Sequence, residues 1–176
     1  MKPQDIILLI KLHTWKQGRW KIVSLANSAL LSPAETHAGI KRLVNSSLFD
    51  PVLEKVKKTE MEEFIIYGTR YCFPAEFGPI SRGIPTAHSA HPLNKMIVAG
   101  GTDSYVWPHA EGKIRGISIK PLYKTAPDAA LVDSILYEYL ALIDALRIGK
   151  AREKEIAKIE LIKLIKKGNN DEATAS

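Results

Sequence analysis

Several features that often reveal a protein's chemistry are scarce in this sequence of 176 residues. It has a single cysteine, Cys72, so an internal disulfide is excluded and a reducing compartment is expected. Its apolar runs are short, since the run from Ile6 to Ile10 ends at Lys11, and roughly 18 apolar residues are needed to span a bilayer. The N-terminal residues also lack the pattern of a signal peptide. We therefore expect a cytoplasmic protein.

The sequence also has no recognisable motif for metal binding, nucleotide binding or catalysis. His88 and His91 form an H-x-x-H pair, with His109 further on, but no cysteine or carboxylate motif accompanies them. The segment SRGIPT, residues 81–86, lacks the lysine of a phosphate loop and is typical of a tight turn, and Gly100–Gly101 indicates a loop. We predict no metal, no cofactor and no enzymatic activity, although catalytic residues can lie far apart in a sequence.

The residues that are present supply a core and an uneven distribution of positive charge. Hydrophobic residues make up 45% of the chain, which argues against wholesale disorder. The formal net charge is +6, and residues 1–50 contain seven basic and three acidic side chains, as do residues 150–167. The middle is therefore nearly neutral. This clustering favours contact with a polyanion, although a solvated surface has a similar composition.

Three helices are predicted within the first fifty residues. Pro3 and Asp5 suit a helix start, because proline needs no amide partner there and the carboxylate faces the positive helix end. Apolar residues then recur at helical spacing as far as His13. After a break and a short strand at residues 20–22, a second helix is expected at residues 23–30. Its start is poorly capped, because no small polar residue precedes it.

The third predicted helix, residues 33–46, has the clearest start signal. Ser32 can cap the helix, Pro33 fits its first position, and Glu35 can reach back to the free amide of Ser32. Three residues at helical spacing are predicted to face the core: Thr36, Ile40 and Leu43. The outward positions are then Ala34, Glu35, His37, Ala38, Lys41 and Arg42.

The segment SLANSALLSPAETHAGIKRLVNSSLF resembles the helix-turn-helix of winged-helix transcriptional regulators, in the broad group that includes MarR-type repressors. The resemblance covers roughly residues 3–49. It is carried by Leu25, Ala26, Leu31, Ser32, Ile40, Lys41, Arg42, Leu43 and Leu48. It implies that the third helix lies in the major groove of DNA, with its N-terminal part addressing the bases.

The same resemblance implies a role for each outward residue. Glu35 and His37 would contact base edges, and Lys41 and Arg42 would contact phosphates or a guanine. Ser32 and the helix amides near it would bind one phosphate. The DNA-binding set implied in this way, with nearby basic residues added, is Ser32, Ala34, Glu35, His37, Ala38, Lys41, Arg42, Lys21, Lys57 and Lys58. The alternative is that the basic residues form a solvated face and that the three helices are a scaffold.

A wing is not evident where the resemblance would place it, directly after Leu48. Residues 51–67 instead show helical spacing, which predicts a fourth helix that ends at Gly68 and is followed by a strand at residues 70–73. The lysines of this helix would lie along DNA or face solvent, with equal weight for both. The segment 74–126 is rich in proline, glycine and histidine, which predicts an irregular arm.

Within that arm we predict a β-hairpin formed by Trp107–Pro108 and residues 114–119. With Lys113 and Arg115 at its tip, this hairpin is the candidate for a displaced wing. Helical spacing returns after Pro127, with one helix to Gly149 and a second to Lys167. Their apolar faces must be buried, either in a dimer or within the chain.

The sequence therefore predicts a mostly α-helical fold with a small β component (α+β), in four regions. These are a helix-turn-helix unit with a fourth helix (1–73), an irregular arm (74–126), C-terminal helices for dimerisation or partner binding (127–167) and a mobile tail (168–176). The expected function is sequence-specific binding of double-stranded DNA by a dimeric repressor, without membrane contact.

Two other functions stay open at this stage. One is an antitoxin-like module that binds a protein encoded in the same operon through its C-terminal helices and also regulates that operon. The other is an enzyme or small-molecule sensor with a site formed by Arg82, His88, His91 and Tyr123.

Overall fold

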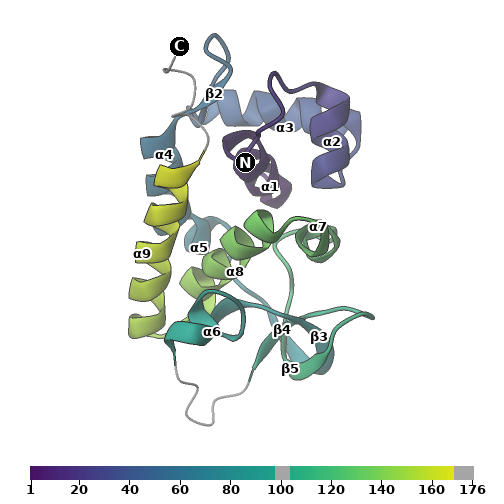
Figure 1. The fold of residues 1–176 in the computed structure, drawn as a ribbon, viewed down its shortest axis with the longest axis vertical. Coiled ribbons are helices and arrows are strands. Elements are labelled where there is room, and N and C mark those ends of the chain that lie inside the picture. Colours follow the sequence, from purple (N-terminus) through teal and green to yellow (C-terminus); the bar gives the residue numbers. More distant parts are fainter. Residues whose placement is uncertain (98–103, 169–176) are drawn as a thin grey trace.

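The computed structural model describes residues 1–97 and 104–168, and it confirms a mostly α-helical fold with a small β component (Figure 1). The elements in chain order are α1 (Pro3–His13), α2 (Ile22–Ala29), α3 (Pro33–Asn45), β1 (Phe49–Asp50), β2 (Lys55–Val56), α4 (Lys58–Glu63), the π-helix η1 (Phe64–Gly68), α5 (Thr69–Cys72), β3 (Phe77–Pro85), the 3₁₀-helix η2 (Ala87–Ser89), α6 (Leu93–Met96), β4 (Tyr105–Pro108), β5 (Ile114–Ile119), α7 (Ala126–Val132), α8 (Ser134–Ile148) and α9 (Ala151–Lys167). The loop predicted at Gly100–Gly101 and the predicted tail, apart from Gly168, lie outside the described residues.

The elements form two ends joined by a central helix. Helices α1–α3 lie at one end, the strands β3–β5 lie at the other, and α8 lies between them (Figure 1). Helix α9 runs along one side and packs against α8 and α4. A hydrophobic core cluster includes residues from both ends, such as Leu25 of α2 and Ile84 of β3. In the described part of the chain, no helix combines the length and the apolarity needed to cross a membrane.

Helix α1 is the central helix of its end of the molecule. All five residues from Ile6 to Ile10 are fully buried, so the helix is covered on all sides. Helix α3 packs closely on it at Gly39, where an added Cβ would collide with the side chain of Leu8. The three predicted helices are present within one residue of their expected bounds, and α2 starts without a side-chain cap, as predicted. The strand expected at residues 20–22 is wrong, since helix α2 already begins at Ile22.

The single helix predicted over residues 51–67 is also wrong at its start. Strands β1 and β2 form a short antiparallel hairpin there, with Phe49 opposite Val56. The Asp50 carboxylate accepts hydrogen bonds from the amides of Val52 and Leu53, at 2.8 and 2.9 Å, which satisfies those amides in a turn. Such side-chain acceptors compete with helix formation. Helix α4 begins only at Lys58.

From α4 onward the chain stays helical through Gly68, where we predicted a stop, and as far as Cys72, within residues 70–73, where we predicted a strand. The π-helix η1 joins α4 to α5 and keeps Met61, Ile65 and Thr69 buried on one side. The absence of a side chain at Gly68 leaves room for the ring of Phe64, which lies close to it within the helix.

The central segment contains a three-stranded sheet in place of an irregular arm with a hairpin. Strand β3 pairs antiparallel with both β4 and β5, whereas β4 and β5 run parallel to each other. The predicted hairpin, and with it the displaced wing at Lys113 and Arg115, is therefore wrong. The segment predicted as a tight turn at 81–86 lies mostly in β3. There Gly83 allows a close approach to the backbone of Trp107, which a Cβ would prevent.

The helix predicted from Pro127 to Gly149 is divided at Asp133. This residue accepts hydrogen bonds from the amides of Ile135 and Leu136, both at 3.0 Å, and so caps α8. It also accepts a hydrogen bond from Lys11 of α1 at 2.6 Å. The predicted stop at Gly149 is confirmed. Helix α8 is buried by packing within the chain, on α9, α7, η2 and α1.

A buried carboxylate joins α8 to the sheet. Asp144 accepts hydrogen bonds from the Thr86 hydroxyl at 2.8 Å and from the Trp107 indole at 2.7 Å. Arg147 donates to the same carboxylate at 2.6 Å and to the carbonyl of Phe73 at 2.8 Å. Complete burial raises the pKa of Asp144, and these partners oppose that effect. The network ties three distant segments to one helix.

The buried His13 makes stability depend on pH. Its Nε2 lies 3.1 Å from the carbonyl oxygen of Ile165, and burial, together with the nearby charge of Lys58, lowers its pKa to about 4. The unfolded chain, with a histidine pKa near 6.5, therefore binds this proton more readily, so stability falls as pH decreases from 6.5 towards 4.

We expect the free energy of unfolding to fall by about 2 kcal/mol between pH 7.5 and pH 5 because of His13 alone. In His13→Gln this part of the pH dependence should vanish. Urea unfolding of both proteins at the two pH values measures the difference. Equal pH dependence in the two proteins would contradict the assignment.

Candidate nucleic-acid interface

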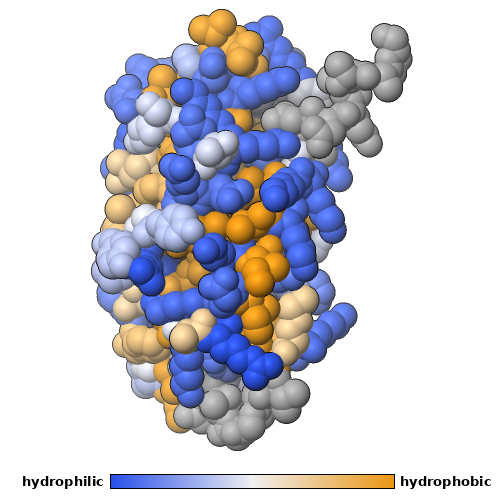
Figure 2. Space-filling view, turned by 90° about the vertical axis from the view of Figure 1, so that its left-hand side faces the viewer, coloured by the Kyte–Doolittle hydropathy of each residue, from blue (hydrophilic) through white to orange (hydrophobic). Residues whose placement is uncertain are grey.

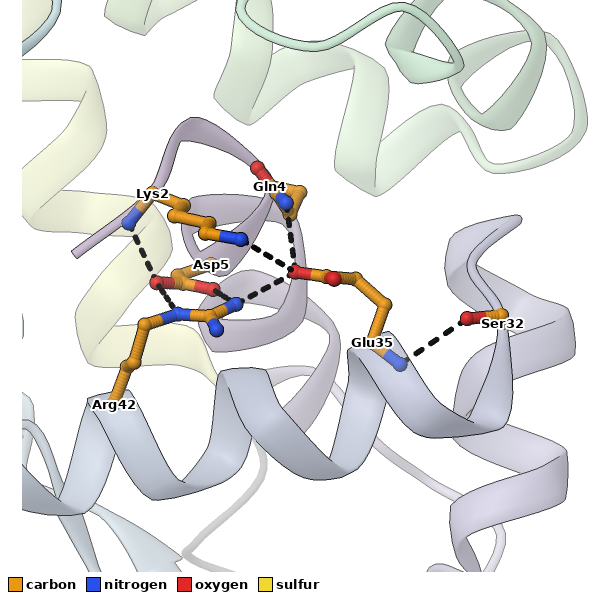
Figure 3. Close-up of polar contacts among 6 residues, drawn as sticks. All are labelled: Lys2, Gln4, Asp5, Ser32, Glu35 and Arg42. Carbon is orange, nitrogen blue, oxygen red and sulfur yellow. Dashed lines mark hydrogen bonds and ion pairs between the residues drawn. The ribbon is translucent and has the colours of Figure 1, made fainter.

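The turn between α2 and α3 sets the start of the candidate recognition helix. Leu30 adopts a left-handed conformation with φ of 51°, and the Leu31 amide donates to the carbonyl of Ala26 at 3.0 Å. The Ser32 hydroxyl accepts a hydrogen bond from the Glu35 amide at 3.1 Å, which confirms the predicted N-cap. The predicted capping box requires the Glu35 carboxylate to accept a hydrogen bond from the amide of Ser32, and this bond is not formed. The carboxylate points towards α1 instead (Figure 3).

The inner side of α3 is joined to α1 by a network of charged groups (Figure 3). The guanidinium of Arg42 donates two hydrogen bonds to the Asp5 carboxylate, at 2.8 and 2.7 Å, and a third to Glu35 at 2.7 Å. Gln4 donates to the same Glu35 oxygen at 2.7 Å. Asp5 is fully buried, so its charge is compensated within the protein by Arg42.

These contacts change the pKa values of the groups involved. Hydrogen bonds from Gln4 and Arg42 lower the pKa of Glu35, and hydrogen bonds to Asp5 and Glu35 raise the pKa of Arg42. Both side chains therefore stay charged and paired near neutral pH. In this arrangement Glu35 and Arg42 are occupied in holding α3 against α1.

The outward side of α3 carries a different set of residues. Ala34, His37 and Lys41 are exposed at helical spacing, and Ala38 is half-buried between them. Ser32 is exposed at the N-terminus of the helix. The only acidic residue of α3 is Glu35, whose charge is turned towards α1. The face presented to solvent is thus short, polar and positively charged at Lys41.

The three remaining predicted lysines lie in different settings. Lys21 is exposed just before α2. Lys57 is half-buried, and its backbone amide donates to the carbonyl of Leu48 at 3.0 Å, which continues the β1–β2 hairpin. Lys58 donates to the carbonyl of Gly168 at 3.3 Å, beyond the last turn of α9. Lys58 is therefore occupied by a contact within the chain.

The β1–β2 hairpin is a part of this surface that sequence reasoning missed. It follows α3 directly and projects beside it at the same end of the molecule (Figure 1). Lys55 is exposed on β2, and Val52 and Leu53 are exposed at the tip. The signal that could have found it is Asp50–Pro51, because aspartate followed by proline favours turn initiation.

Three of the residues considered for an enzyme or sensor site have separate partners, and the fourth, Tyr123, packs against the hydrophobic core. Arg82 donates to the carbonyl of Gly112, whereas His88 packs against the ring of Tyr105. The Nδ1 atom of His91 lies 3.9 Å from a carboxylate oxygen of Glu138. Among residues 1–97 and 104–168, no group of three or more histidine, cysteine or acidic side chains is placed to hold a metal ion.

Comparison with known proteins returned no match: no protein-family model, no curated protein sequence and no solved structure matches this chain.

We expect the neighbours Lys41 and Arg42 to differ sharply in their effect on stability. Arg42→Ala leaves the Asp5 carboxylate buried without its cation and should lower the free energy of unfolding by about 3 kcal/mol. Lys41→Ala removes only an exposed side chain and should change it by less than about 0.5 kcal/mol. Urea denaturation measures both values. Similar values for the two variants would show that the Asp5–Arg42 pair does not stabilise the α1–α3 contact.

Proposed function

We propose that this protein is a regulator of transcription that binds double-stranded DNA, with α3 in the major groove, and that it acts as a repressor by occupying its operator. The observation that carries this proposal is the outward face of α3. It presents His37 and Lys41 beside small residues, while the one acidic side chain of the helix is neutralised on the inner face. The single cysteine supports a cytoplasmic location.

The contacts divide into two groups under this proposal. His37 is the side chain suited to base edges, and Ala34 and Ala38 allow the helix to approach the bases and thymine methyl groups closely. Lys21, Lys41 and Lys55 are suited to phosphates on either side. Ser32 and the Ala34 amide, at the N-terminus of a 13-residue helix, complete the phosphate contacts.

Glu35 and Arg42 have a positioning role in this account. Arg42 joins α3 to Asp5 of α1, and Glu35 joins α3 to Gln4 of α1. Replacing Lys41 and Arg42 together would therefore confuse loss of DNA contacts with loss of folding. The single replacements of His37 and Lys41 avoid this problem because both side chains are exposed.

The test is binding to duplexes that the full-length chain selects from a random pool. Affinity should fall steeply with salt, by roughly a thousandfold between 50 and 200 mM if about six phosphates are contacted by two protomers. Lys41→Ala should weaken binding at least about tenfold and lower the salt slope by about one per protomer. His37→Ala should weaken binding mainly to the selected sequence. Fluorescence anisotropy measures each value.

Lys95→Ala is the matched control. Lys95 is an exposed lysine on α6, at the end of the molecule opposite to α3 (Figure 1). The Lys95→Ala variant should bind the selected duplex as the wild type does. If Lys41→Ala and Lys95→Ala weaken binding equally, or if no duplex is bound, α3 is not the recognition element.

A second candidate function, binding of a partner protein, is favoured by the outer side of α9 and η1. Figure 2 shows hydrophobic surface running down this side of the molecule between hydrophilic side chains. Ile159 of α9 is 46% exposed, and Tyr67 of η1 and Tyr71 of the adjoining α5 are 56% and 71% exposed. Lys158 lies over the ring of Tyr67, and Arg70 lies over that of Tyr71. Exposed tyrosine and arginine beside apolar residues are typical of protein interfaces.

The same side could receive a second copy of the chain, and dimerisation would suit a repressor. Two recognition helices would then contact half-sites about 34 Å apart. Helix α8 is less suited to either contact, because most of its apolar residues, Ile135 excepted, are already buried within the chain.

Ile159→Asp distinguishes these two occupants. If the face is a dimer contact, analytical ultracentrifugation should show a dimer for the wild type and a monomer for Ile159→Asp, with at least a tenfold loss of affinity for a palindromic duplex. If a partner encoded in the same operon binds there, co-expression should give a stoichiometric complex that Ile159→Asp abolishes. A monomeric wild type that forms no such complex would contradict both assignments.

A further inference from the structure

Two large apolar side chains project from the tip of the β1–β2 hairpin. Val52 is 88% exposed and Leu53 is 65% exposed, and they are adjacent in sequence. We call Val52 and Leu53 the tip pair. Isolated exposed apolar residues are common on protein surfaces, but a pair at the end of a projection has little chance of burial within its own chain.

The tip pair is held in a fixed position. Asp50 accepts hydrogen bonds from the amides of both residues, and Pro51 precedes them with a restricted φ. On the other side of the tip, Arg19 donates two hydrogen bonds to the Glu54 carboxylate, at 2.9 and 2.8 Å. The hairpin therefore presents Val52 and Leu53 on a preformed support, so that little conformational entropy is lost when they make contact.

The charges around the tip pair favour a polyanion over an apolar protein surface. Glu54 is paired with Arg19, and Asp50 is satisfied by backbone amides and lies near Lys57. Lys55 is exposed next to the tip, and Lys21 is exposed before α2 at the same end of the molecule. The tip is thus apolar and narrow, with the exposed Lys55 beside it, and the two acidic side chains that flank it are paired within the chain.

Because the hairpin lies next to α3, the part of a bound duplex that the tip pair can reach is the minor groove. The hairpin follows α3 after three residues, so a duplex whose major groove receives α3 brings an adjacent minor groove towards the hairpin. The minor groove is about 6 Å wide, which admits a two-residue tip. Apolar side chains such as leucine enter minor grooves by separating two base pairs, and this bends the duplex.

We propose that the tip pair acts as a wedge that enters the minor groove, partly unstacks one base step and bends the bound DNA. This inference rests on the proposed function, because it requires α3 to bind the neighbouring major groove. The wedge favours flexible pyrimidine–purine steps such as TA at the site of insertion, since these are the easiest steps to unstack. Part of the sequence preference of the protein would then come from the ease of unstacking at a base step whose edges the protein does not contact.

The test uses the full-length chain and a 30-base-pair duplex selected by it from a random pool, with donor and acceptor dyes at the two ends. Binding should raise energy transfer between the ends, and 2-aminopurine placed at the step beside the hairpin should become at least about twofold brighter on unstacking. The double variant Val52→Ser, Leu53→Ser should bind about tenfold more weakly and lose both signals at saturation. Replacing the TA step by GG should reduce wild-type affinity but leave that of the variant nearly unchanged.

The matched control replaces another adjacent pair of exposed apolar residues, Leu131 and Val132 of α7, by serine. It should bend the duplex as the wild type does, and a thermal melt followed by circular dichroism should show that both double variants are folded.

The outcomes separate the two proposals. If the wild type binds DNA without bending it, or if the tip variant bends it fully, the wedge is refuted and the proposed function stands. If the wild type selects no duplex from the pool, both fall. If the tip variant keeps both signals but loses a co-expressed partner, the tip is a protein contact.

Discussion

The bidentate pairing of Arg42 with the buried Asp5 is the interaction on which the proposed DNA-binding end depends. A carboxylate without solvent contact needs a cation with fixed geometry, and the planar guanidinium supplies two parallel hydrogen bonds. Asp5 lies on the buried helix α1, and Arg42 lies on α3, whose other side faces solvent. The pair therefore fixes the position of α3 relative to the core. Gly39, which lets the two helices approach closely, is required by the same contact.

This arrangement explains how one short helix can have two functions. On one side of α3, Thr36 and Leu43 pack into the core. Glu35 and Arg42 on the same side make the contact with α1. The other side is left with small residues, a histidine and a lysine. A helix held in this way needs no adjustment when it contacts another molecule, and preorganisation of this kind lowers the cost of binding.

The sequence predicted most of the helices but not the partners of their charged side chains. Helix α3 was found through Ser32 and Pro33, whose effects are local. Arg42 was assigned to DNA because a basic residue at an outward position has the same pattern whether it meets a phosphate or a carboxylate 37 residues away. The sheet was missed for a similar reason, since the pairing of β3 with β5 joins segments that are distant in sequence. The hairpin β1–β2 was missed because two-residue strands are too short to show alternation, while Val52, Leu53 and Val56 imitate helical spacing.

The return of α9 to the N-terminal end of the fold has an electrostatic consequence. Its last turn carries exposed Lys166 and Lys167, and Lys58 meets the carbonyl of Gly168 near the buried His13. The last residues of the basic stretch 150–167 thereby lie at the same end of the molecule as the basic stretch 1–50 (Figure 1). Positive charge gathered at one end of a protein contributes to a dipole moment. Under the proposed function, the field of the DNA turns this end of the protein towards it during diffusion, so that more encounters begin in the productive orientation.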